Sequence, residues 1–187
     1  EVEDLLLRAT KLRATTSNSN VIKSSDVIFT LVATPSLDDG SYDCSLVDAV
    51  VCDLIRSPNL EGKKFIIGCT TNPGFVDKVD QKLEGRGISV FYSPEFVAQG
   101  TIIRDMKNAD MILCGGRDTE GFELIKEIYL SFMDSQVNFY PMSNTAAEIT
   151  KIGINCFLTY KISYANMMGQ ILYNSGLVMR LKTFSHP

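Results

Sequence analysis

The sequence predicts an α/β fold, in which a parallel sheet carries helices on both faces and one long helix follows. Two observations predict it. Between residues 27 and 140, short runs rich in β-branched and aromatic residues alternate with segments whose apolar residues recur at helical spacing. Beyond Pro141, residues 144–173 contain no proline and keep a helical pattern. Because strands and helices alternate, each helix is expected to connect two parallel strands across a face of the sheet.

The individual elements follow from the local pattern. The chain opens with an amphipathic helix, and a polar segment covers residues 14–18. The first predicted strand, 27–33, is almost continuously apolar, as in a strand that is buried on both faces. Further strands are predicted at 64–69, 88–92, 111–114 and 137–140, and helices at 44–56, 75–83 and 120–132.

Composition excludes several classes of protein. The 187 residues include 18 Lys and Arg against 22 Asp and Glu, and this net charge of −4 argues against binding nucleic acid or an anionic membrane. No apolar run approaches the roughly 18 residues of a membrane span, and we expect no secretory leader. Five scattered cysteines and a single histidine, His186, argue against a zinc site and a Ser-His or Cys-His catalytic pair. Unpaired cysteines are typical of a reducing compartment, so we expect a cytoplasmic protein.

A glycine-rich phosphate loop is missing from the sequence. The G-x-G-x-x-G motif of dinucleotide-binding sheets follows a strand and opens a helix, so that the pyrophosphate meets the helix N-terminus. The G-x-G at Gly85 and Gly87 precedes a predicted strand instead, and we interpret it as a helix-to-strand turn. Either the chain binds no dinucleotide, or its first β-α-β unit is missing.

Four polar segments are the candidates for function. Three of them, at 34–36, 70–74 and 93–100, directly follow predicted strands, and the fourth, 147–163, lies on the long helix. Ligands of open α/β sheets bind at the carboxyl ends of the strands. Taken singly, each segment has a plainer interpretation. Thr34 and Thr70 could cap local structure, Glu95 could be a solvated turn residue, and Lys151 could be a surface lysine.

Taken together, these segments resemble the nucleotide-sugar dehydrogenase family, which includes UDP-glucose 6-dehydrogenase and GDP-mannose dehydrogenase. The resemblance extends from about residue 2 to about residue 173. Its most specific parts are Pro94-Glu95-Phe96 through Gly100 and the run EITKIGINCFLTYKIS, which ends at Ser163. The family also has Thr-Pro after a strand and then an acidic, glycine-containing loop, here Thr34 to Asp43.

The resemblance implies a partial Rossmann-like, doubly wound NAD-binding domain at 1–141, without its first β-α-β unit. The start of an α-helical dimerisation domain then follows at 142–187. The implied activity is an NAD-dependent, four-electron oxidation of a nucleotide sugar, with UDP-glucose converted to UDP-glucuronate as the leading expectation. UDP-N-acetyl-hexosamine and GDP-mannose are alternative substrates, and a non-catalytic truncated fragment is an alternative of another class. The implied partners are NAD, the nucleotide sugar and a second copy of the chain, because the apolar residues of the long helix surround most of its surface.

The resemblance also implies roles for individual residues. Thr70 would place a hydroxyl near the cofactor or a catalytic water, and Glu95 would hold water or act as a base in thioester hydrolysis. Lys151 and Asn155 would stabilise an oxyanion with an ammonium and an amide. The implied catalytic residues are thus Thr70, Glu95, Lys151 and Asn155. The implied cofactor contacts are Thr34, Pro35, Thr70 and Gln99. The implied substrate contacts are Glu95, Phe96, Val97, Ala98, Gln99, Lys151 and Asn155.

The sequence departs from the family pattern in three ways. Gln99 stands where the family often has a second acid, which puts a role as base there in doubt. Cys69 stands where the family usually has serine, and the Gly-x-Cys-x-Pro-Lys-Asp segment with the nucleophile does not occur, so we expect the isolated chain to be inactive. A 3-hydroxyacid or phosphogluconate dehydrogenase also combines such a sheet with a helix-borne lysine, but Pro94-Glu95-Phe96 disfavours that alternative.

Overall fold

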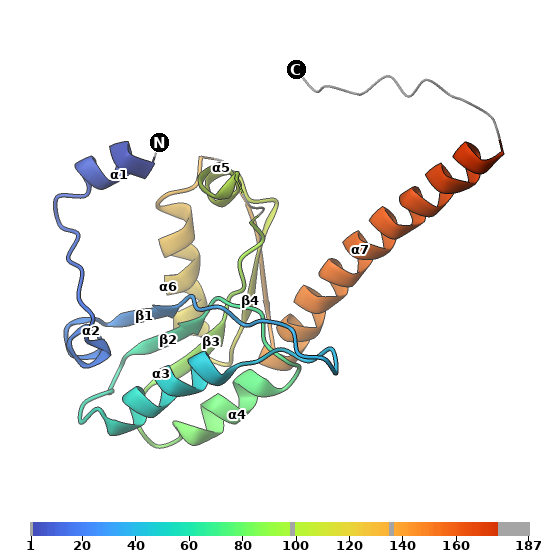
Figure 1. Ribbon diagram of the computed structural model, residues 1–187. Helices are drawn as coiled ribbons and strands as arrows, with labels where there is room; N and C mark the ends of the chain where they lie inside the picture. Colours follow the sequence, from blue (N-terminus) through green and yellow to red (C-terminus); the bar gives the residue numbers. More distant parts are fainter. Residues whose placement is uncertain (1, 98–99, 135–136, 176–187) are drawn as a thin grey trace. The chain divides into compact units, whose positions relative to one another are not determined.

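The computed structural model describes residues 2–97, 100–134 and 137–175. It divides into two compact units, Glu1–Ile149 and Thr150–Pro187. The first unit contains the sheet and the helices around it, and the second contains most of the long helix α7 (Asn144–Asn174) (Figure 1). Among the described residues, no helix combines the length and the apolar character needed to cross a membrane.

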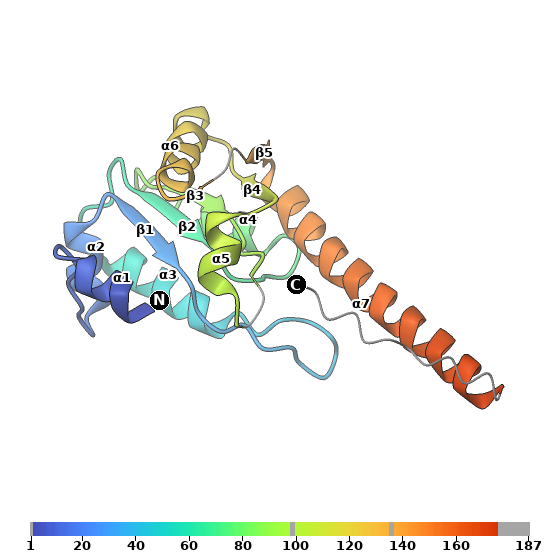
Figure 2. The same ribbon diagram turned by 90° about the horizontal axis from the view of Figure 1, so that it is seen from above.

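A five-stranded sheet forms the centre of the first unit. Its strands lie in the same order as in the sequence, namely β1 (Val27–Thr30), β2 (Lys64–Ile67), β3 (Ser89–Tyr92), β4 (Met111–Gly115) and β5 (Asn138–Met142). β1, β2 and β3 are mutually parallel, and β4 is parallel to β5. The predicted α/β class with a mostly parallel sheet is therefore confirmed. Figure 2 shows β1, β2 and β3 side by side.

One strand pairing differs from the prediction. β4 is antiparallel to β3, and the two strands meet where Tyr92 pairs with Gly115. Among the described residues of the connection between them, the one helix is the short α5 (Ile102–Lys107), which buries no residue. A parallel connection requires a crossover that packs along the sheet and returns the chain to the edge where the previous strand began. α5 does not provide one, so β4 enters the sheet from the opposite end.

Helices cover both faces of the sheet. The alternation of side chains along β2 shows this, because Phe65 and Ile67 belong to one buried cluster and Ile66 belongs to another. The first cluster includes side chains of α3 (Ser45–Arg56) and α4 (Phe75–Lys82), and the second includes side chains of α6 (Thr119–Leu130). In Figure 1, α3 and α4 accordingly lie on the opposite side of the sheet from α6. The doubly wound arrangement is thus present.

The amino-terminal part contains two short helices. α1 (Val2–Arg8) falls within the predicted opening helix, and its described side chains are exposed. α2 (Asn18–Ser24) was not predicted; the Ser17 side chain caps it by accepting from the Asn20 N–H, and Ile22 buries against the sheet. The Gly85–Gly87 segment lies between α4 and β3, and both glycines have positive φ angles, of 75° and 73°. Its interpretation as a helix-to-strand turn is therefore confirmed.

Candidate cofactor and active site

The segments that follow β1, β2 and β3 lie at one edge of the sheet. Because these strands are parallel and in register, their carboxyl ends coincide. Hydrogen bonds extend the alignment beyond the strands. The Gly68 N–H donates to the Thr30 carbonyl (3.0 Å), and the Ser93 N–H donates to the Ile67 carbonyl (2.9 Å). The Glu95 N–H then donates to the Gly68 carbonyl (3.1 Å), which places the Glu95 segment directly beside the Thr70 segment.

The predicted residues at this edge differ in exposure. Thr34 and Thr70 are half-buried, Pro35 is exposed, and Ser93 and Pro94 are buried. Glu95 and Phe96 are half-buried, and Val97 is exposed. Ala98 and Gln99 lie outside the described residues. The edge thus presents two threonine hydroxyls and one carboxylate on segments held by backbone hydrogen bonds.

A small cavity lies beneath the Glu95 segment. Its volume is about 30 Å³, and its lining includes Glu95, Phe96 and Tyr129. The Ser93 hydroxyl donates to the Tyr129 hydroxyl at 3.1 Å. Burial raises the pKa of Tyr129, and the negative charge of Glu95 raises it further. The cavity has room for a water molecule but not for a sugar ring.

The loop that carries Thr34 is fastened to the Thr70 segment. The Asp43 N–H donates to the Pro35 carbonyl (2.8 Å), which closes the loop on itself. The Asn72 amide then binds the backbone of Tyr42 twice, because its oxygen accepts from the Tyr42 N–H and its nitrogen donates to the Tyr42 carbonyl, both at 2.8 Å. Two of the predicted segments therefore form one hydrogen-bonded assembly.

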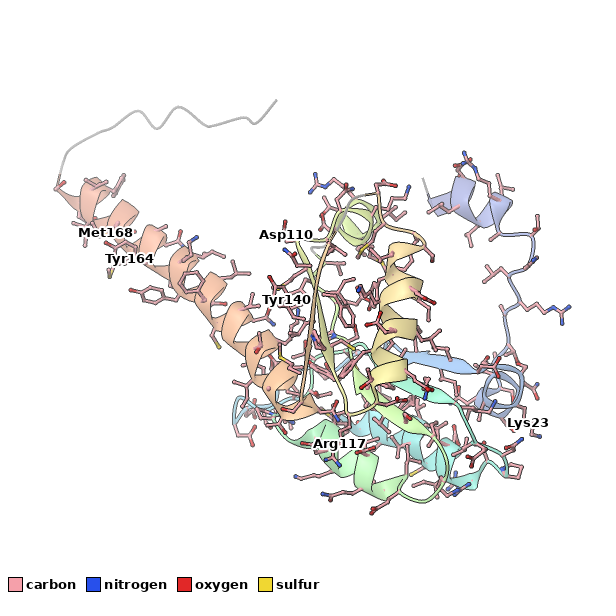
Figure 3. The ribbon with its side chains drawn as sticks, turned by 180° about the vertical axis from the view of Figure 1, so that it is seen from behind. Lys23, Asp110, Arg117, Tyr140, Tyr164 and Met168 are labelled. Carbon is pink, nitrogen blue, oxygen red and sulfur yellow. The ribbon has the colours of Figure 1, made fainter. Side chains whose placement is uncertain are left out.

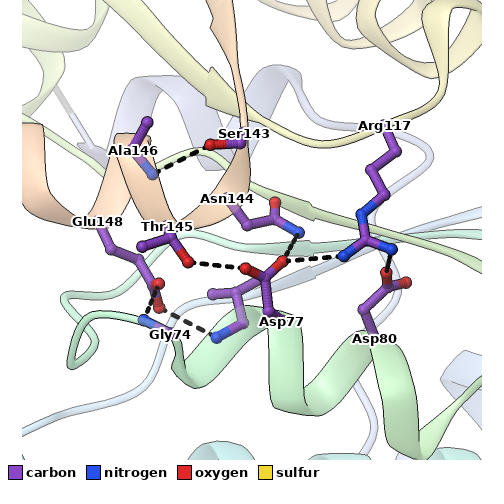
Figure 4. A network of polar contacts seen from close by, with 10 residues as sticks. Gly74, Asp77, Asp80, Arg117, Ser143, Asn144, Thr145, Ala146 and Glu148 are labelled. Carbon is purple, nitrogen blue, oxygen red and sulfur yellow. Dashed lines mark hydrogen bonds and ion pairs between the residues drawn. The ribbon is translucent and has the colours of Figure 1, made fainter.

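Glu148 is the residue at this edge to which the sequence analysis gave no role. It lies in the first turns of α7 and is fully buried. Its carboxylate accepts hydrogen bonds from the Thr71 hydroxyl (2.8 Å), the Gly74 N–H (2.6 Å) and the Val76 N–H (3.0 Å). Figure 4 shows the contact between Glu148 and Gly74. Burial raises the pKa of Glu148, the three donors oppose that rise, and the charge of nearby Asp77 adds to it. The carboxylate therefore caps the N-terminus of α4 from another element.

A second carboxylate connects the same two helices in the opposite direction. Asp77, in the first turn of α4, accepts from the Thr145 hydroxyl (2.7 Å) and the Asn144 amide (3.3 Å) at the start of α7. The Arg117 guanidinium forms ion pairs with both Asp77 and Asp80, each with a nitrogen-to-oxygen distance of 3.5 Å. Both ion pairs are drawn in Figure 4. The starts of α4 and α7 are thus joined by two carboxylates with different partners.

Lys151 and Asn155 belong to the second unit of the chain. They follow Glu148 on α7; Lys151 is 7% exposed and Asn155 is half-buried. Further along the helix the apolar side chains are exposed, including Tyr164 and Met168, both of which Figure 3 labels. Within the described residues, no three His, Cys, Asp or Glu side chains gather as a metal site.

The comparison with protein families decides which family the chain belongs to. The NAD binding domain of the UDP-glucose/GDP-mannose dehydrogenase family matches residues 2–133, which is most of the chain. The chain belongs to this family. The resemblance that the four segments suggested is therefore confirmed, and so is NAD as the cofactor of the domain.

Individual relatives give the extent of the similarity. UDP-glucose 6-dehydrogenase of Pseudomonas aeruginosa is 27% identical over 180 residues, covering 91% of this chain and 39% of the relative. An uncharacterised protein of Methanocaldococcus jannaschii is 29% identical over 175 residues, covering 91% of this chain and 19% of the relative. The crystal structure of a ternary complex of GDP-mannose dehydrogenase from Pseudomonas aeruginosa superposes with a TM-score of 0.84 at 27% identity, covering 94% of this chain and 42% of that one. The chain thus spans less than half the length of these relatives.

The residues of this edge suit one part of NAD better than another. The two crossover helices that start at this edge each begin beside a carboxylate: Asp43 accepts from the Ser45 N–H at α3, and Glu148 caps α4. A carboxylate in that position competes with a phosphate for the same N–H groups. Within the described residues, the starts of α3 and α4 therefore do not suit a pyrophosphate. The hydroxyls of Thr34 and Thr70 do suit the ribose hydroxyls and the carboxamide of NAD, with which they can exchange hydrogen bonds.

Proposed function

We propose that this chain supplies the cofactor-facing middle part of a nucleotide-sugar dehydrogenase that oxidises UDP-glucose to UDP-glucuronate. The observation that supports the proposal is the alignment of the Thr34, Thr70 and Glu95 segments at one sheet edge of a domain from this family. We further propose that residues 1–141 belong to the NAD-binding domain and residues 142–187 begin a helical dimerisation domain.

The reaction is a four-electron oxidation. A primary alcohol and one water together give a carboxylate, three protons and two hydride equivalents, and NAD, when bound, would supply the hydride acceptor for each of the two oxidations. The hydroxyl of Thr70 hydrogen-bonds the cofactor or the attacking water. A thioester would join the oxidised sugar carbon to the cysteine of the family's Gly-x-Cys-x-Pro-Lys-Asp segment. When water attacks it and the cysteine thiol leaves, Glu95 takes the proton from that water, a step in which a positioned carboxylate contributes roughly 10²–10⁴-fold. The segment from Phe96 to Gln99 lines the sugar site.

Lys151 and Asn155 act on the negative charge of the substrate oxygen. The Lys151 ammonium and the Asn155 amide donate hydrogen bonds to the oxygen that becomes negative when hydride leaves and when a nucleophile adds. Preorganised donors of this kind stabilise the transition state more than the ground state, because the charge develops only along the reaction.

The second unit supports the proposal of a homodimer. From Phe157 to Tyr173, its large apolar side chains are exposed, including Phe157, Ile162, Met167 and Ile171 at 60%, 63%, 52% and 53%. Apolar side chains repeated over four turns form a surface of the kind that obligate interfaces bury. A second copy of the chain is the partner that we propose for it.

GDP-mannose is the second candidate substrate. It is favoured by the TM-score of 0.84 to GDP-mannose dehydrogenase. UDP-N-acetyl-hexosamines remain a third candidate, and a non-catalytic fragment is the candidate of another class.

Product stoichiometry in the complete polypeptide that carries these residues tests the proposal. UDP-glucose, GDP-mannose and UDP-N-acetylglucosamine are supplied separately with NAD, and NADH is followed at 340 nm. We expect two NADH for each UDP-glucose consumed, and a Glu95→Gln variant should lower kcat by about 10²-fold or more. The matched control, Glu84→Gln, changes an exposed carboxylate and should leave kcat unchanged. One NADH per sugar, or no NADH from any of the three, would contradict the proposal.

A further inference from the structure

The Glu148 carboxylate is the most deeply buried acidic group of the first unit that the proposed reaction does not use. A buried carboxylate is costly unless hydrogen bonds replace its water. Its three hydrogen-bond donors come from six consecutive residues, Thr71 to Val76, which immediately follow Thr70. One short segment therefore supplies all of these hydrogen bonds. It lies at the cofactor edge, by which we mean the carboxyl edge of β1–β3 that carries Thr34, Thr70 and Glu95.

The local sequence explains why the N-terminus of α4 needs a hydrogen-bond acceptor from another element. Gly74 occupies the N-cap position of α4 with a φ of 82°, and it has no side chain that could accept from the first N–H groups of the helix. Glu148 accepts from two of those groups instead, and both of its oxygens are used. Because a carboxylate accepts more strongly than a hydroxyl or an amide, this contact holds the start of α4 firmly.

The anchored segment also fixes its neighbour. Asn72 lies between Thr71 and Gly74, and its side chain makes both hydrogen bonds to the Tyr42 backbone. Tyr42 ends the loop that begins at Thr34 and Pro35 and is closed by the bond from the Asp43 N–H to the Pro35 carbonyl. A contiguous set of hydrogen bonds therefore connects Glu148 to both loops that carry the candidate cofactor contacts.

We propose that Glu148 is a positioning residue of the cofactor edge, whose carboxylate fixes the Thr70 segment and, through Asn72, the Thr34 loop. Thr71 points into the buried side of this segment while Thr70 stays half-exposed, so the bond to Thr71 sets the orientation of the neighbouring hydroxyl. The part of this inference that concerns NAD rests on the proposed function. The part that concerns the segment does not.

The test uses Glu148→Gln, which keeps the size of the side chain but replaces one acceptor oxygen with an NH₂ donor. In the ¹⁵N-labelled chain, exchange of the backbone N–H groups of residues 71, 72 and 74–76 should accelerate at least about tenfold, while exchange at the β4–β5 pairing stays unchanged. The NAD dissociation constant, from the chemical shifts of the Thr34 and Thr70 amides, should rise at least about tenfold, which corresponds to about 1.4 kcal/mol.

Two further variants keep the test decisive. Ile125→Val removes one methyl group from the cluster on the other face of the sheet, so it should lower stability without changing NAD affinity. Thr71→Val removes a single donor to Glu148, and it replaces Glu148→Gln if that variant does not fold. For Thr71→Val, amide exchange should also accelerate and NAD affinity should also fall, but both changes should be smaller than for Glu148→Gln.

Each outcome bears on a different part of the account. Unchanged exchange at residues 71–76 would overturn the inference, and so would faster exchange with unchanged NAD affinity. A loss of affinity in Ile125→Val equal to that in Glu148→Gln would also overturn it, because general destabilisation would then suffice. If NAD shifts neither threonine amide in the wild-type chain, the proposed function fails, and the exchange rates alone still decide whether Glu148 fixes the segment.

Discussion

The Thr71→Val substitution measures how strongly the fold depends on the buried carboxylate. The Thr71 side chain is fully buried, and its hydroxyl donates to Glu148 at 2.8 Å. Valine has the same shape, so the change removes one hydrogen bond to a charged acceptor and leaves no large cavity. Such a bond contributes about 1.5–3 kcal/mol to the free energy of unfolding. For a chain of this size each kcal/mol shifts Tm by about 2–4 °C, so we expect Tm to fall by roughly 3–12 °C.

The pH dependence of the loss of stability in Thr71→Val distinguishes the missing hydrogen bond to Glu148 from altered side-chain packing around residue 71. Burial raises the pKa of Glu148, and the Thr71 hydroxyl is one of the groups that lower it. Removing the hydroxyl therefore raises the pKa of Glu148 in the folded protein further. The loss of stability in Thr71→Val relative to the wild type is full where Glu148 is ionised, above that pKa, and it shrinks as the pH falls through that pKa and Glu148 becomes protonated. Circular dichroism melts at pH 7 and at about pH 4 measure both values, with Thr71→Ser as the control that keeps the hydroxyl. A Tm change below about 1 °C at pH 7, or the same change at both pH values, would refute the reasoning.

Three further predictions concern the reaction, the interface and the core. In the complete enzyme, Lys151→Ala should lower kcat by roughly 10²–10³-fold and barely change Tm; an early melt with unchanged kcat would show a structural role instead. Met168→Lys with Ile171→Lys should convert a dimer into a monomer in sedimentation, and a wild-type chain that is already monomeric would contradict the interface. Gly121→Ala should destabilise the chain by about 1–3 kcal/mol in urea unfolding, because the added methyl would overlap the Phe91 ring; an unchanged midpoint would contradict this close contact.

The regular elements of the fold could be predicted from the sequence because each has a strong local pattern. Strands such as β2 are rich in apolar and β-branched residues, here Phe65, Ile66 and Ile67, and helices such as α3 repeat their apolar residues every three to four positions. The predicted strand at 27–33 was too long, because β1 ends at Thr30 and its apolar continuation already belongs to the loop at the site. α2 was missed because only two of its seven residues are apolar, and α5 because its six residues form less than two turns.

The direction of β4 and the role of Glu148 could not be predicted, because neither depends on a local sequence pattern. The direction of β4 depends on where the chain between Ser93 and Asp110 travels, and no local pattern encodes that path. Glu148 lies within the motif that suggested the family, but its partners are 72 to 77 residues away. A glutamate after an alanine on a helix has no local sign of burial. Only the folded structure reveals that it caps α4.

The position of NAD on the chain tests the central claim most directly. Titration of the ¹⁵N-labelled chain with NAD, followed residue by residue, shows which amides contact the cofactor. We expect saturable shifts at Thr34, Thr70 and Phe96, at the carboxyl edge of β1–β3. Shifts concentrated instead around the hollow of about 490 Å³ that Gly85, Gly87 and Arg117 help to line, with none at those three residues, would contradict it.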